Sequence, residues 1–165
     1  MTTDLRRKVL EVYAAVDAAV AAAGPRCDAS GRCCRFTEFG HTLFISRFEA
    51  DILLESAESF AQPVSRDGCP FQVDGLCTTR ESRPLACRIY FCDAAYAERM
   101  VEITEASITK LKALADEHGT SWEYAPLHHF LDTHQFVKRP SPRPPDSMTS
   151  RESRHPLEVL PTGGD

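Results

Sequence analysis

Seven cysteines are the residues of this chain whose type and spacing point most directly to chemistry. Four follow the spacing C-x7-C-x9-C-x4-C within residues 69–92, and three follow the pattern C-x5-C-C within residues 27–34. Thiolate sulfur is a soft ligand that suits zinc, copper(I) and iron–sulfur clusters. We therefore predict a metal centre whose candidate ligands are Cys27, Cys33, Cys34, Cys69, Cys77, Cys87 and Cys92.

The number of cysteines exceeds what one metal site needs, because a structural zinc site and a [4Fe–4S] cluster each take four ligands. Two tetrahedral metals that share one bridging thiolate would use all seven. A cluster held by four would leave three for a second site or as free thiols. Neighbouring side chains in an extended segment point to opposite sides, so the pair Cys33-Cys34 favours two sites. His41 is the histidine nearest to the cysteines in sequence and is a candidate for an eighth ligand.

The redox compartment decides whether these thiols pair with one another or bind metal. The first 27 residues have a basic start and an Ala-rich run like a secretory signal, but Glu11 and Asp17 interrupt the apolar stretch. An odd number of cysteines also fits poorly with a complete disulfide framework. We expect reduced thiols in a cytoplasmic protein, with a disulfide-rich exported protein as the alternative. No 18-residue apolar run occurs, so we expect no membrane span.

Charge and motifs limit the other classes of function. The net charge of −5 and the pI near 5.7 lack the basic character of a nucleic-acid binder, so we expect no nucleic-acid partner. The sequence contains no Gly-rich phosphate loop, G-x-S-x-G or HExxH motif. Whether the chain is an enzyme, and whether it has a protein partner, therefore stays open.

Arginines crowd both groups of cysteines, and a tetrathiolate site carries negative charge that nearby hydrogen-bond donors can tune. The same arginines could instead be solvated surface charges. Arg83 and Arg88 are the strongest candidates for donors to sulfur because they flank Cys87. Cys87 could also be a nucleophile activated by Arg88, but six further cysteines favour ligation. The flanking arginines are Arg26, Arg32, Arg35, Arg80, Arg83 and Arg88.

Helical signals surround the cysteine-rich segments and predict a mostly α fold, a small helical domain around an irregular cysteine-rich metal-binding centre. An apolar stripe predicts a helix over 4–23 that Gly24-Pro25 ends. Ser46 and Glu49 form a capping box that opens a helix to about residue 57. The other predicted elements are an extended arm over 41–45, a helix from the cap Asp93 to about His118, and a short helix after Trp122 with Pro126 in its first turn.

Composition divides the chain into two parts. Residues 1–137 form the predicted cysteine-cluster metal-binding domain. Residues 138–165 hold six of the eleven prolines and almost no large hydrophobic side chains. Such a segment buries too little surface to offset its ordering entropy, so we predict a disordered Pro-rich tail.

The segment from 27 to 92 resembles the YkgJ-type cysteine-cluster family of zinc- or iron-chelating domains. The shared features are Cys33-Cys34, the helix with Glu49, Cys69-Pro70-Phe71, Gly75-x-Cys77, Arg83-Pro84-x-x-Cys87-Arg88 and Cys92. The chain departs from fuller members in having seven cysteines instead of eight and Thr78-Thr79 in place of a bulkier pair. Flagellin lysine N-methylases carry a related cluster, which implies iron and sulfur. The expected function is thus an iron–sulfur protein with a redox or enzyme-assisting role, and the alternative is a zinc-stabilised interaction module.

Overall fold

The computed structural model describes residues 1–134. Six α-helices and two sheets of two strands each make up this part, which confirms the mostly α fold. The predicted tail over 138–165 lies outside the described residues. The helices are α1 (Thr3–Ala23), α2 (Phe36–Phe39), α3 (Arg47–Ser56), α4 (Leu85–Ile89), α5 (Ala97–Glu117) and α6 (Leu127–Thr133). The strands are β1 (Phe44–Ser46), β2 (Gln72–Val73), β3 (Leu76–Cys77) and β4 (Tyr124–Pro126).

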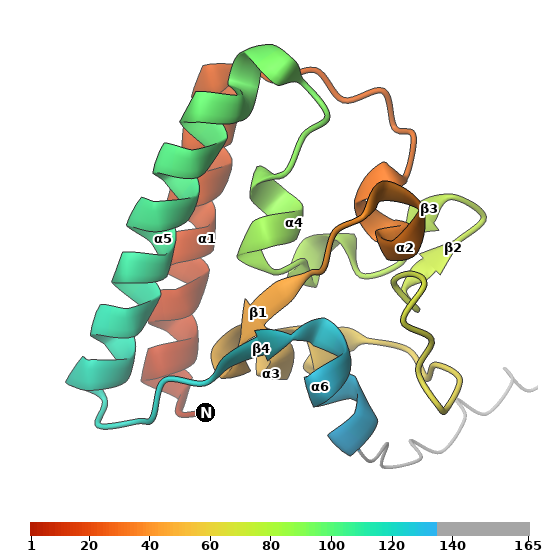
Figure 1. Ribbon diagram of the computed structural model, residues 1–165. Helices are drawn as coiled ribbons and strands as arrows, with labels where there is room; N and C mark the ends of the chain where they lie inside the picture. Colours follow the sequence, from red (N-terminus) through yellow and green to blue (C-terminus); the bar gives the residue numbers. More distant parts are fainter. Residues whose placement is uncertain (135–165) are drawn as a thin grey trace, which may run out of the picture.

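The two long helices α1 and α5 lie side by side and form one flank of the molecule (Figure 1). The predicted apolar stripe of α1 is buried against α5 and α4, and Gly24 ends the helix in the left-handed conformation with φ 62°. Each fully buried aliphatic side chain stabilises such a core by about 1.5–3 kcal/mol. The buried residues of α1 are Leu5, Val9, Val12, Tyr13, Val16 and Val20.

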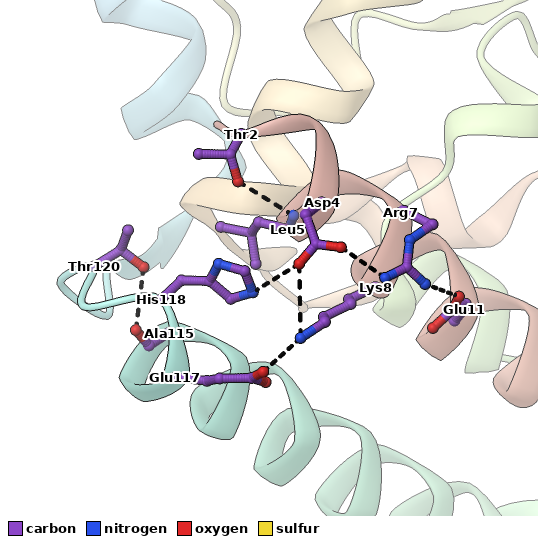
Figure 2. A network of polar contacts seen from close by, with 10 residues as sticks. All are labelled: Thr2, Asp4, Leu5, Arg7, Lys8, Glu11, Ala115, Glu117, His118 and Thr120. Carbon is purple, nitrogen blue, oxygen red and sulfur yellow. Dashed lines mark hydrogen bonds and ion pairs between the residues drawn. The ribbon is translucent and has the colours of Figure 1, made fainter.

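A polar network joins the start of α1 to the end of α5 (Figure 2). Lys8 bridges Glu117 and Asp4, and the Nε2 atom of His118 lies 3.7 Å from the same Asp4 carboxylate. Asp4 stands at the positive end of the α1 dipole, where a carboxylate is stabilising. Because the carboxylates of these pairs are about half-exposed, each pair adds at most about 1 kcal/mol and serves mainly to fix the antiparallel alignment.

A second core lies beneath α3 and α6, beside the sheet that β1 and β4 form. The antiparallel register pairs Phe44 with Pro126 and Ser46 with Tyr124. The prediction of a single helix after Trp122 is therefore wrong at its start, because the backbone of 124–126 finds a strand partner before α6 begins.

The predicted helix after Cys92 begins later than its cap suggests. Asp93 does accept a hydrogen bond from the backbone N–H of Ala95, but the turn that it opens, Ala94–Tyr96, is a 3-10 turn. This tighter turn places the buried Tyr96 ring edge-on against Phe91, with 5.8 Å between the ring centroids. No helix within residues 1–134 is long and apolar enough to cross a membrane.

Candidate metal centre

Six of the seven cysteines line one cavity of about 370 Å³. They come from separate segments: the loop after α1, the 3-10 turn Arg32–Cys34, the loop before β2, strand β3 and helix α4. All seven cysteines of the chain are free thiols. The cysteines that line the cavity are Cys27, Cys33, Cys34, Cys69, Cys77 and Cys87.

Cys92 is the predicted ligand that does not line the cavity. Its side chain is exposed, and its Sγ atom lies 3.9 Å from the hydroxyl of Tyr90, a residue that does line the cavity. The fold therefore places Cys92 beside the rim and gathers the other six.

The pair Cys33-Cys34 points its two sulfur atoms in similar directions. The residues lie in a 3-10 turn that follows Gly31, and their Sγ atoms are 3.9 Å apart. The prediction that the pair lies in an extended segment is therefore wrong, and two metal sites stay a prediction. Two sulfurs bound to one tetrahedral zinc at about 2.3 Å would be separated by about 3.8 Å, so both thiols are placed to share one ion.

Two glycines let the separate cysteine segments approach each other. Cys69 donates its backbone N–H to the Cys34 carbonyl at 2.8 Å, and a Cβ atom on Gly68 would lie 2.9 Å from that same oxygen. A Cβ atom on Gly31 would lie 2.3 Å from Nε2 of Gln72, which donates a hydrogen bond to the Gly31 carbonyl. At position 68 the contacted atom is backbone, so a side chain there would force the segments apart, and at position 31 the left-handed φ of 67° favours glycine.

Burial and mutual contact raise the pKa values of three cavity thiols, those of Cys33, Cys34 and Cys87. For Cys34, the hydrogen bond with Cys33 lowers the pKa, but the hydrogen bond with Cys69 and burial raise it to about 12. The hydrogen bond with Cys34, followed by burial, raises the pKa of Cys33. Burial, followed by the charges of Cys34 and Cys33, raises the pKa of Cys87. Metal ligands must be thiolates, so a cation that enters this cavity must displace protons.

The donor set fits a thiolate-bound metal in type and in number, because six soft sulfur donors share one partly apolar cavity. Within the part of the chain that the structure describes, no three or more Cys, His, Asp or Glu side chains already have the arrangement that holds an ion. Ligation would therefore require these thiols to lose protons and rotate toward a common point.

Glu49 joins the capping box of α3 to the helix that carries Cys87. Its Oε2 atom accepts hydrogen bonds from the backbone N–H and the hydroxyl of Ser46, and its Oε1 atom accepts the backbone N–H of Leu85 at 2.7 Å. Leu85 is the first residue of α4 and is preceded by Pro84. One buried carboxylate therefore satisfies backbone donors at the starts of two helices, which fixes α4 relative to α3.

Thr79 is a residue of the site that the sequence analysis named only as part of the pair Thr78-Thr79, with no role beside sulfur. It is buried, and its Oγ1 atom lies 3.6 Å from Sγ of Cys77. A hydroxyl beside a sulfur ligand can donate to the thiolate and tune it. The signal in the sequence was a hydroxyl side chain two residues after Cys77, close enough to reach its sulfur.

Arg88 does not serve the sulfur atoms as predicted. All three of its guanidinium nitrogens donate to oxygen atoms: those of the Asp17 carboxylate at 2.6 Å, the Arg83 carbonyl at 2.7 Å and the Glu81 carbonyl. The group also lies 4.4 Å from the centroid of the Tyr13 ring. Arg88 thus acts as a buried link between α1 and the turn before α4.

Arg83 and Arg80 do line the cavity. The positive charge of Arg83 lowers the pKa values of Cys33 and Cys87, and so opposes part of the rise described above. A hydrogen bond from Arg83 to sulfur thus stays a prediction, for a residue that does line the cavity, and Arg80 lines the cavity where Arg88 does not.

His41 lies beside the cysteines but does not line the cavity. Its Nε2 atom is 3.3 Å from the carbonyl oxygen of Cys33, and its ring stacks on Tyr90 with 5.8 Å between centroids. Its buried Nδ1 atom has no hydrogen-bond partner within residues 1–134. As placed, the ring packs against the 3-10 turn and is not directed at the cavity.

No protein-family model, curated protein or solved structure matches this chain.

Proposed function

We propose that this protein binds metal through cysteine thiolates. The observation that carries the proposal is the cavity that six cysteines from separate segments share. Thiols that merely filled a core would be spread among the apolar side chains of both core clusters, whereas here they surround one space. Soft sulfur donors in this number suit zinc or an iron–sulfur cluster.

The inner ligands of the proposed centre are the buried and half-buried cysteines of the cavity, which come from β3, α4, the 3-10 turn and the loop before β2. Cys27, exposed at the mouth of the cavity, completes the set. The bound metal would cross-link these segments and, as an iron–sulfur cluster, would also carry an electron. The inner ligands are Cys33, Cys34, Cys69, Cys77 and Cys87.

An iron–sulfur cluster with a redox or enzyme-assisting role is the first candidate. The support for this candidate is the resemblance stated above, because the related cluster of flagellin lysine N-methylases implies iron and sulfur. A zinc-stabilised interaction module is the second candidate, which the 3.9 Å separation of the Cys33 and Cys34 sulfurs favours. Both fit a cytoplasmic protein, since thiols stay reduced there.

Elemental analysis of the full chain, purified without oxygen, tests the proposal together with its visible spectrum. A brown protein with iron and acid-labile sulfide supports the first candidate, and a colourless protein with one or two zinc ions per chain supports the second. Protein that contains neither metal, and that binds neither when its reduced form is supplied with them, contradicts the proposal.

A further inference from the structure

The charges around the cavity are strongly unbalanced. Within the described residues, no Asp, Glu or Lys side chain lines it, and the groups with a fixed charge are the guanidinium groups of Arg80 and Arg83. Neither group has a carboxylate partner among residues 1–134. With its thiols protonated, the cavity therefore carries two uncompensated positive charges.

A metal–thiolate centre reverses this imbalance. A divalent ion bound by four thiolates carries two negative charges, and two guanidinium groups neutralise them. A [4Fe–4S] cluster whose core carries two positive charges has the same total with four thiolates. The two arginines therefore match the charge of either candidate centre.

The hydrogen bonds around Arg83 leave its guanidinium group able to neutralise a charge in the cavity. Its Nε atom donates to the carbonyl of Arg80 at 3.0 Å, which leaves its two terminal nitrogens without partners within residues 1–134. Its backbone carbonyl accepts a hydrogen bond from Arg88, which is itself held by Asp17 of α1. A buried link thus fixes the turn from which Arg83 reaches the cavity.

We infer that Arg80 and Arg83 are the charge partners of the metal centre and strengthen its metal binding, and that Arg88 positions them. This inference rests on the proposed function. The inference assigns Arg80 and Arg83 the role of neutralising the negative charge of the metal centre. An exposed arginine near the same cysteines that already has a carboxylate partner does not have this role. Arg35 is such a residue, because Glu38 already pairs with it and it does not line the cavity.

Zinc titration of the full chain, stripped of metal and kept reduced, tests this inference by competition with a chromophoric chelator. Arg83→Gln should weaken zinc binding by about tenfold or more, as loss of an outer partner of a metal site does. Arg83→Lys keeps the charge and should restore most of the affinity. Arg80→Gln should weaken binding although the Arg80 side chain makes no hydrogen bond within residues 1–134. Arg35→Gln should leave binding unchanged.

The possible results separate the two proposals. Two results would overturn the charge role and leave the metal centre standing. In the first, the wild type, Arg83→Gln and Arg80→Gln all bind zinc equally tightly. In the second, Arg35→Gln weakens zinc binding as much as these two variants do. If the purified chain holds an iron–sulfur cluster instead, both charge-removing variants should lower its reduction potential, and an unchanged potential overturns the role. A wild type that binds no zinc and holds no iron overturns both proposals.

Discussion

The Oε1 atom of Glu49 accepts the backbone N–H of Leu85 across 36 residues of sequence, at 2.7 Å. Glu49 is 2 % exposed, so both of its carboxylate oxygens are removed from water and depend on protein donors. The bond sets where α4 begins, and α4 carries Cys87 into the cavity. Glu49, which caps α3, therefore also helps to position Cys87 in the proposed metal centre.

Replacing Glu49 with Ala should destabilise the metal-free chain by about 1–3 kcal/mol or more, because it leaves buried donors of Ser46 and Leu85 unsatisfied. Denaturant unfolding of the reduced protein measures the change. Glu55→Ala is the matched control on the same helix, since Glu55 is half-exposed and pairs with Arg6 at the surface. Equal effects of the two substitutions would contradict the double cap.

Glu49 should also give the protein a pH-dependent stability. Burial raises the pKa of this carboxyl above its ordinary value of 4.5, although the hydrogen bonds from Ser46 and Leu85 and the charge of Arg88 oppose the rise. The folded state then binds more protons than the unfolded state between pH 4.5 and the raised pKa. The contribution of Glu49 to stability is therefore largest below pH 4.5 and falls as the pH rises through the folded pKa.

Unfolding of the metal-free protein in urea at several pH values, starting at about 4.5, checks this sign. Glu49→Gln removes the titrating group, so its free energy of unfolding should fall less steeply with pH than that of the wild type. Parallel curves for the two proteins would show that Glu49 does not titrate differently in the folded state.

Gly68→Ala should damage the cysteine cavity more than the rest of the fold. The new Cβ atom would lie 2.9 Å from the Cys34 carbonyl, and relieving this contact must separate Cys69 from Cys34. Overpacking of this kind costs about 1–3 kcal/mol. Metal content and melting temperature should both fall.

Gly40→Ala is the control for this substitution. Gly40 has φ 64° but open space around its Cα, so Ala there is strained without touching the cysteines. It should lower stability by about 1 kcal/mol and leave the metal content unchanged. If Gly40→Ala lost metal to the same extent as Gly68→Ala, the effect of Gly68→Ala would be one of general instability.

Cys87→Ser and Cys92→Ser should differ sharply in how much they reduce the metal content and the melting temperature. Cys87 lies inside the cavity on α4, whereas Cys92 is exposed beside the rim. Loss of Cys87 should reduce the metal bound per chain and the melting temperature, because metal binding contributes to folding free energy. Loss of Cys92 should change both much less. Metal analysis and thermal melting of protein purified without oxygen provide the comparison, and equal losses would place Cys92 among the ligands.

Local signals were sufficient to predict much of the helical frame. The apolar stripe of α1, the glycine at its end and the capping box of α3 each depend on residues within a few positions of one another. The sheet of β1 and β4 joins residues 44–46 to 124–126, and three-residue strands carry no measurable periodicity. Helix α4 has five residues, too few for a pattern, and is capped by a carboxylate from another helix.

The site was predictable in its residue types and not in its geometry. Cysteine chemistry identified the candidate ligands, but the direction of Cys33 and Cys34 depends on a 3-10 turn that Gly31 begins. Arg88 and Arg83 looked equivalent in sequence. The Asp17 carboxylate and two backbone carbonyls, which only the folded chain brings together, turn Arg88 away from sulfur.

X-ray absorption spectroscopy at the metal edge tests most directly whether the cavity thiols bind metal. The full chain, purified without oxygen, should show a shell of sulfur atoms at about 2.3 Å from zinc or iron, with sulfur as the predominant ligand. A bound metal with only oxygen and nitrogen neighbours, or a metal-free chain whose cavity cysteines are paired as disulfides, would contradict the thiolate centre.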